Sequence, residues 1–283
     1  MKRRDDQHID EIIEHVRLFL AQRQGHHIGK TGSPDQDERN RRACDALLAG
    51  GGIQFAVEHT SLDSFREQRG DDTRFRAVLG ELENELKGQL PDHVDLCIPT
   101  HAIPSGQDWK GFRETIRAWL TAHVKEGPYD RFVPAKVPGV PFSLHVRRER
   151  CDGPGSLFAM RWSVPEHDTQ RIEIMVERLI DKAEVLERYR DQGCRTVLVL
   201  ESSDNVLVSR YSLHEDFQMA SRSYSPTAID HILLVQTGTC PWCVTPLWYD
   251  GATVDGVHPC WPMAPGYPLV GTQWEGLDRE DEI

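Results

Sequence analysis

The sequence predicts an α/β protein in which a central mixed β-sheet is flanked by helices. Three patterns support this class. Residues 168–192 repeat apolar side chains at helical spacing and lead into RTVLVLE, residues 195–201, whose apolar run is typical of a buried strand. Residues 7–24 carry a second helical stripe of apolar side chains. Residues 53–60 alternate between two sets of side chains, as a strand does.

The length and composition fit such a fold. The chain of 283 residues is long enough for one large α/β domain or two small ones. We expect a single domain over residues 1–250 and an extension rich in Pro, Gly and Trp over 251–283. No apolar run is long enough to span a membrane. The net charge of −12 argues against tight binding of nucleic acid through overall charge, but it is compatible with a local basic groove.

The N-terminus and the cysteines both indicate the cytoplasm. The opening MKRRDDQHIDEIIEH is charged and lacks the apolar stretch of a secretory signal. The seven cysteines are odd in number and scattered, which predicts reduced thiols rather than a disulfide framework. We therefore expect a cytoplasmic protein without a membrane partner, and the sequence leaves its oligomeric state open.

The other elements follow from apolar periodicity and from the positions of Gly and Pro. Helices are expected where apolar residues recur at helical spacing, at 72–89, 109–124 and 213–220. Strands are expected where short apolar or alternating runs stand between turn residues, at 43–48, 94–98, 142–150, 156–164, 206–209, 229–236 and 244–249. Loops are expected where polar residues mix with Gly and Pro, at 26–42 and 127–141.

The stretch over residues 43–60 predicts a β-hairpin that carries two carboxylates. The three glycines at 50–52 supply the positive φ angles of a tight reversal. If Leu48 pairs with Ile53, Glu58 becomes the diagonal neighbour of Asp45, at roughly 7–8 Å between Cα atoms. A register shifted by one residue would turn Glu58 to the other face, so a shared site requires an even connection.

Two carboxylates on rigid strands suit a hard divalent cation such as Mg²⁺, which prefers oxygen ligands and retains water. Such an ion polarises a phosphoryl oxygen and lowers the pKa of a bound water. The alternative is that Asp45 and Glu58 are solvated residues at strand ends. The residues alone therefore predict a possible divalent site and leave its use open.

Asp45, the hairpin and Glu58-x-Thr60 resemble the PD-(D/E)xK superfamily of nucleases, also called restriction-endonuclease-like. Its pattern is an acidic residue on one strand and acidic-x-Lys on the next. Two positions depart from the pattern, because Cys44 stands where the family often has Pro and Thr60 stands where it has Lys. The wording AVEHTSLDSF resembles an uncharacterised bacterial branch in which Glu-x-Thr is common. The resemblance covers the first half of the chain more fully than the second.

This resemblance implies a restriction-endonuclease-like fold and metal-dependent hydrolysis of phosphodiester bonds in nucleic acid. Asp45 and Glu58 would hold Mg²⁺ or Mn²⁺. In some members the catalytic lysine has moved to a neighbouring helix, and Lys182 lies on the inward stripe of helix 168–192. Lys182 would position the water and offset charge in the transition state. Its alternative role is structural, with a buried stem and an ammonium that reaches water.

A second function stays open on the same resemblance. A degenerate member of the fold would bind nucleic acid or a partner protein without cleaving. Thr60 in place of lysine and the acidic net charge both favour this alternative.

Other clusters have simpler explanations. Cys240, Cys243, His258 and Cys260 offer four zinc ligands, but His-x-Cys is not a common spacing, and a strand-like VTPLWY follows where a redox motif needs a helix. A hairpin turn with two thiols is preferred, so zinc is not expected. Glu201 and Asp204 end a strand, where the turn sequence SSDN explains them.

Two basic clusters are interpreted as solvated surface. They comprise Arg39, Arg41 and Arg42 before the hairpin, and Arg147, Arg148 and Arg150 later in the chain.

Overall fold

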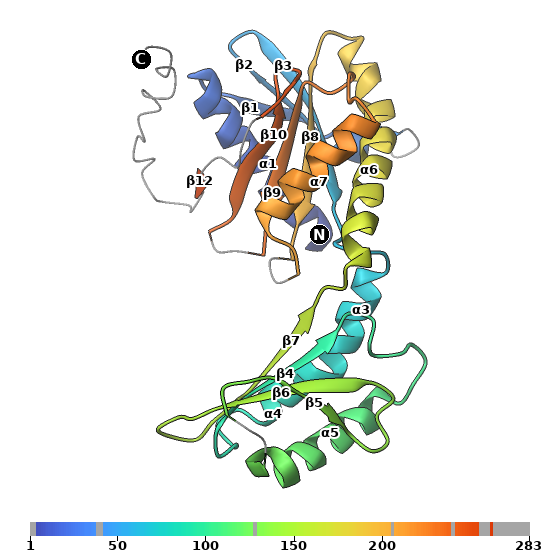
Figure 1. Cartoon of the computed structure of the whole chain (residues 1–283). Coiled ribbons are helices and arrows are strands. Elements are labelled where there is room, and N and C mark those ends of the chain that lie inside the picture. The colour runs from blue at the N-terminus through green and yellow to red at the C-terminus, as the bar shows by residue number, and fades with distance from the viewer. Residues whose placement is uncertain are drawn as a thin grey trace, which may run out of the picture.

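The computed structural model describes residues 4–37, 42–126, 129–204, 207–238, 241–254 and 261–262. Within these residues the chain forms two β-sheets in two lobes (Figure 1). The predicted α/β class and the mixed sheet flanked by helices are confirmed in the larger lobe. The second sheet, which forms the smaller lobe, was not anticipated.

The larger sheet holds eight strands within the described residues. Seven follow one another across the sheet as β1 (Gly29–Gly32), β2 (Ala46–Gly50), β3 (Ile53–Ser61), β8 (Arg195–Ser202), β9 (His231–Gln236), β10 (Cys243–Tyr249) and β11 (Ala252–Thr253). The short β12 (Trp261–Pro262) also pairs with β10. Strands β3, β8 and β9 are parallel to one another, and the remaining pairs are antiparallel. The carboxyl ends of the three parallel strands therefore meet at one edge of the sheet.

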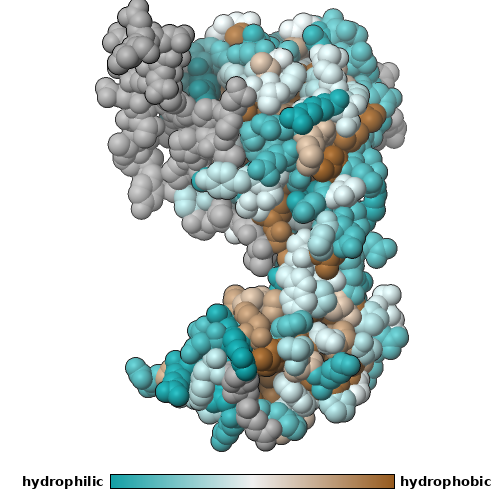
Figure 2. Space-filling model, in the orientation of Figure 1, coloured by the Kyte–Doolittle hydropathy of each residue, from teal (hydrophilic) through white to brown (hydrophobic). Residues whose placement is uncertain are grey.

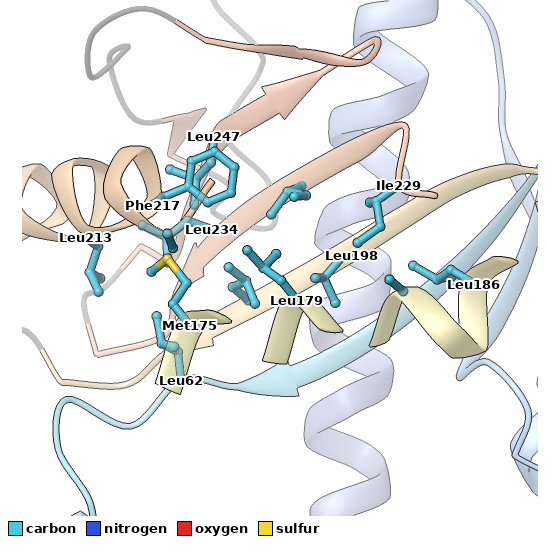
Figure 3. Packing of buried hydrophobic residues seen from close by; sticks show 14 of the residues in the cluster. Leu62, Met175, Leu179, Leu186, Leu198, Leu213, Phe217, Ile229, Leu234 and Leu247 are labelled. Carbon is cyan, nitrogen blue, oxygen red and sulfur yellow. The ribbon is translucent and has the colours of Figure 1, made fainter. Parts of the chain in front are cut away.

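Helices cover both faces of this sheet. On one face, α1 (Arg4–Gln24) buries its apolar stripe against side chains such as Val57 and Val199. On the other face lie α6 (Glu166–Arg190) and α7 (Arg210–Ser223). Figure 3 shows this second core, in which Leu179 of α6 meets Leu198 of β8. Because side chains alternate along a strand, consecutive residues of β3 and β8 face different helices.

The smaller lobe is inserted between β3 and α6. Its helical part comprises α3 (Gln68–Phe75), a π-helical turn (Arg76–Gly80), α4 (Glu81–Glu85), α5 (Trp109–His123) and a 3₁₀ turn (Val124–Glu126). Its sheet has the order β5 (Val133–Lys136), β6 (Ser143–Glu149), β4 (His93–Pro99) and β7 (Leu157–Trp162). The helices pack on one face of this sheet around Leu82, Leu96 and Leu120.

Strands β6 and β7 lie on either side of β4 and do not pair with each other. β6 is antiparallel to β4, and β7 is parallel to it. The chain makes this crossing at Gly155, whose backbone exchanges hydrogen bonds with Leu90. A Cβ atom at Gly155 would lie 1.9 Å from the carbonyl oxygen of Asp92, so only glycine permits the approach.

Three sequence expectations about loops and strands are wrong. The segment 26–42 contains β1 and the short helix α2 (Pro34–Asp37), and 127–141 contains β5. Both strands lie at sheet edges, where one partner suffices, so polar residues and even Pro134 are tolerated. The strand expected at 206–209 is absent at 207–209, and Val206 lies outside the described residues.

The cysteines only partly follow the expectation of reduced thiols. Cys44, Cys97, Cys151 and Cys194 are free, whereas Cys243 is disulfide-bonded. Among the described residues, no helix has both the length and the apolar character needed to cross a membrane. The cytoplasmic location and the C-terminal extension over 251–283 stay predictions, since most of that extension lies outside the described residues.

Candidate functional site

The hairpin formed by β2 and β3 places the two predicted carboxylates near each other. Gly50 pairs with Ile53 across a two-residue turn, whose glycines have φ angles of 59° and 82°. The pairing considered from the sequence, Leu48 with Ile53, is wrong by two residues. The even connection is preserved, because Ala46 pairs with Val57. Asp45 immediately precedes β2 and lies close enough to Glu58 for their charges to interact.

Lys182 reaches this pair from helix α6. Its ammonium Nζ lies 2.6 Å from Oε1 of Glu58. The Glu58 side chain is only 6% exposed and that of Lys182 is 20% exposed, so the ion pair is largely shielded from water. Asp45 accepts a hydrogen bond through Oδ2 from the backbone N–H of His59, at 2.6 Å. The structure therefore brings all three sequence-predicted site residues into one neighbourhood.

One oxygen of Glu58 and the neighbouring residue Thr60 further describe the site. The second oxygen of Glu58, Oε2, is buried and has no hydrogen-bond partner among the described residues. Thr60, an uncharged residue, is buried on the same strand two residues after Glu58. Lys182 supplies the positive charge beside Glu58.

Burial and neighbouring charge make Glu58 an unusual carboxylate. Desolvation raises its pKa to about 7, the negative charge of Asp45 adds to this rise, and the hydrogen bond from Lys182 opposes it. Burial also raises the pKa of Asp45, against the hydrogen bond donated by the His59 backbone. Glu58 therefore exchanges a proton near neutral pH, beside a second carboxylate.

Asp35 is a site neighbour that the sequence analysis missed. It lies in α2, within the segment expected to be a loop, and its backbone N–H donates to the carbonyl of Cys44 at 3.2 Å. This bond anchors α2 beside Asp45, and the charge of Asp35 contributes to the raised pKa of Glu58. No sequence pattern links Asp35 to the hairpin, because the link is made by backbone packing.

We expect Asp35→Asn to lower the pKa of Glu58, because it removes a nearby negative charge. Carbon NMR of the Glu58 carboxyl, followed across neutral pH in both proteins, measures this directly. Glu187→Gln, an exposed residue of α6, is the matched control and should leave the titration unchanged. An unaltered Glu58 titration in Asp35→Asn would show that Asp35 is electrically remote from the site.

A second buried carboxylate, Glu201, lies at the carboxyl end of β8 on the α1 face. Its Oε1 contacts Nε2 of His8 at 2.6 Å and the hydroxyl of Thr237 at 2.9 Å. Its Oε2 contacts Nε2 of His59 at 3.0 Å and the hydroxyl of Ser61 at 3.3 Å. Burial alone would raise the pKa of Glu201, but the hydrogen bonds from His59, His8 and Thr237 hold it at about 2.

The sequence analysis interpreted both Glu201 and Asp204 as turn residues, but the structure gives them different roles. Asp204 does serve a turn, since its Oδ1 accepts from the backbone N–H of Leu207 at 3.0 Å. Glu201 does not, and the turn interpretation is wrong for it. Its partner His8 comes from α1, 193 residues away, so no local pattern could have indicated the contact.

Among the remaining clusters, Arg42 lies close enough to Glu58 for their charges to interact. Cys243 is disulfide-bonded and so is not a free thiolate for zinc, while Cys240, His258 and Cys260 lie outside the described residues. Arg42 pairs with Asp181 and Glu184 on α6, and Arg39 and Arg41 lie outside the described residues. The Arg147 cluster belongs to the smaller lobe, where Arg148 is buried and pairs with Asp92, so the interpretation as solvated surface is wrong for Arg148.

The described residues contain no group of three or more His, Cys, Asp and Glu side chains arranged to hold a metal ion. Comparisons of the chain with protein-family models, with curated proteins and with solved structures find no match. The chemistry of Asp45, Glu58 and Lys182 is therefore the basis for a proposal about its function.

Proposed function

We propose that this protein hydrolyses phosphodiester bonds of nucleic acid with the help of a divalent cation, Mg²⁺ or Mn²⁺. The observation that carries the proposal is the 2.6 Å contact between Lys182 and Glu58, next to Asp45. Two carboxylates from one hairpin and a lysine from a neighbouring helix are the combination that the PD-(D/E)xK resemblance implies.

The residues fit a hard divalent cation. Asp45 and Glu58 offer carboxylate oxygens, which Mg²⁺ and Mn²⁺ prefer. The buried Oε2 of Glu58 has no hydrogen-bond partner among the described residues, and an uncompensated buried oxygen is costly unless a ligand satisfies it. Asp45 and Glu58 would hold the ion, which when bound polarises a phosphoryl oxygen and acidifies water.

The protein's own groups supply positioning and charge. The His59 backbone N–H fixes the orientation of the Asp45 carboxylate. Lys182 offsets negative charge that develops on the phosphoryl group, and its shielded position makes that charge more effective than in water. Without a cation, burial and the charge of Asp45 raise the pKa of Glu58 to about 7, and a bound cation would favour its ionised form as a ligand.

A non-catalytic member of the same fold is the second candidate. It is favoured by the same ion pair, because Lys182 already balances the charge of Glu58 without a cation. Thr60 at the family's lysine position also favours it. Such a protein would bind nucleic acid or a partner protein.

Metal binding separates these two functions. We expect Mn²⁺ and Mg²⁺ to bind the wild type in calorimetry, and Glu58→Ala to weaken binding by about tenfold or more, since one of two carboxylate ligands is lost. Glu187→Ala, which removes an exposed carboxylate from α6, should bind as the wild type does. The titration is repeated with a phosphorothioate oligonucleotide present, so that an ion entering only with the substrate is also detected. If neither titration shows Glu58-dependent binding, the non-catalytic function replaces the proposal.

A further inference from the structure

The face of the smaller sheet that lies opposite the helical layer carries a distinct set of side chains. Strand pairing places Arg147 beside Asp95 and Asp95 beside Phe158, and Phe132, which immediately precedes β5, lies against Arg147. The next row places Pro134, His145, Cys97 and Met160 on the same face. Beyond it lie two further pairs, Lys136 with Ser143 and Pro99 with Trp162. We call these residues the open face.

Two phenylalanine side chains of the open face are unusually exposed. Phe158 is 48% exposed and Phe132 is 40% exposed. The alternate side chains of the same strands, such as Leu144 and Leu157, are buried under the helices. Figure 2 shows hydrophobic surface on the smaller lobe beside the notch that separates it from the larger lobe. Exposed aromatic groups gathered on one surface mark an interaction site more often than scattered ones do.

Cations are interleaved with these aromatic rings. The Arg147 guanidinium lies 5.0 Å from the centre of the Phe132 ring and is held in place by a 2.7 Å hydrogen bond to Oδ2 of Asp95. Lys136 is exposed on the same face, and within the described part of the chain it forms no ion pair. Arg147 also pairs with Glu149 at 2.9 Å, so two carboxylates balance its charge. The face therefore offers stacking surfaces together with the positive charge of Lys136.

The charge of the region differs from that of the rest of the protein. Residues 131–150 contain five basic side chains and a single acidic one, whereas the whole chain carries a net charge of −12. Arg148 is buried and pairs with Asp92, so the exposed cations of this segment are Arg131, Lys136 and Arg150. These three side chains make the hairpin less repulsive to a negatively charged partner than the protein as a whole.

We propose that the open face binds single-stranded nucleic acid, with unpaired bases stacked on Phe132 and Phe158 and the backbone near Arg147 and Lys136. Flat sheets that present aromatic rings bind bases in this way, and each stacked base contributes to affinity without strong sequence preference. A duplex keeps its bases paired and stacked, so it cannot offer their faces to the rings. The identification of the bound strand as the substrate rests on the proposed function. The binding itself does not require Asp45 or Glu58.

The test is fluorescence anisotropy with the full chain and labelled oligothymidine and oligouridine of about 20 nucleotides, in EDTA so that cleavage cannot occur. We expect Phe132→Ala/Phe158→Ala to weaken single-strand binding by about tenfold or more, because both stacking platforms are lost. Tyr211→Ala is the matched control, since Tyr211 is 55% exposed and also lies beside an arginine, Arg210, but belongs to α7.

Three results would overturn this inference: no single-strand binding by the wild type, equal binding of a duplex of the same length, or binding unaffected by the double substitution. Self-association of the wild type that the double substitution abolishes would identify the face as a subunit interface instead. Thermal unfolding of each variant confirms that the exposed substitutions leave the fold intact. Strand binding without any Mn²⁺-dependent cleavage would remove the proposed nuclease activity while leaving this inference standing.

Discussion

Replacing Lys182 by methionine is expected to lower the free energy of unfolding by about 3 kcal/mol at pH 8.5 and by less than about 1 kcal/mol at pH 5. Methionine is unbranched like lysine, is one atom shorter, and removes the charge. At high pH the substitution leaves a buried, ionised Glu58 without its partner, and an uncompensated buried charge is costly.

The pH dependence follows from the raised pKa of Glu58. A carboxylate whose pKa rises from 4.5 to about 7 on folding binds more protons in the folded state, so its contribution to stability is complete below pH 4.5 and is lost as pH rises through 7. Lys182 opposes this loss through its hydrogen bond and charge. At pH 5 Glu58 is protonated in the folded protein with or without Lys182, and the two proteins should then differ little.

Urea unfolding at pH 5, 7 and 8.5 measures the effect. Lys110→Met is the matched control, because Lys110 pairs with Glu114 at 4.0 Å on the exposed surface of α5, where about 0–1 kcal/mol is expected at every pH. A loss of stability that is the same at pH 5 and pH 8.5 would contradict the assigned role of the ion pair. If the proposed function holds, hydrolysis by Lys182→Met should also fall by about 10²–10³-fold.

Replacing Glu201 by glutamine is expected to lower the free energy of unfolding by about 3 kcal/mol at pH 6. The pKa of Glu201 is about 2 in the folded protein against an ordinary value of 4.5, and each pH unit of difference corresponds to about 1.4 kcal/mol. Glutamine fills the same space but gives His8 and His59 a neutral partner in place of a carboxylate.

The sign of the pH dependence is opposite to that of Glu58. A carboxylate with a lowered pKa contributes stability above pH 4.5 and loses it as pH falls towards 2. The stability difference between wild type and Glu201→Gln should therefore shrink below pH 4.5. Urea unfolding between pH 3 and pH 7 checks this, with Glu173→Gln on the exposed side of α6 as a control that should remain within about 0.5 kcal/mol. A difference that stays constant on acidification would show that Glu201 acts through shape rather than charge.

The sequence predicted best where one physical pattern decides a structure. The stripe of α6 and the apolar run of β8 required helix and strand, and both formed within two residues of the predicted ends. Edge strands β1 and β5 carry no such pattern, because each needs only one neighbour and remains largely exposed. The second sheet went unnoticed because pairing partners cannot be read from alternation alone.

The residues of the candidate site also fall into those that local patterns could place and those that they could not. Asp45 and Glu58 could be brought together from the sequence because a tight glycine turn fixes the parity of a hairpin, even though the register was misjudged by two residues. Lys182 could be placed because helical spacing fixes the face on which it lies. Asp35 and His8 reach their carboxylates through contacts between elements that the sequence does not connect, so local patterns hold no information about them.

The insertion of the smaller lobe between β3 and α6 also sets the order in which the protein can fold. In the parallel pairing of β3 with β8, Glu58 lies beside Leu198, 140 positions later in the chain, and Lys182 also follows the whole insertion. Contacts across such separations form slowly, because the loop must close before they stabilise it. The smaller lobe makes its strand pairings among nearer neighbours. Pulse-labelled hydrogen exchange during refolding should therefore find the amides of β4 protected before those of β3 and β8. The ion pair between Glu58 and Lys182 would be among the last native contacts to form.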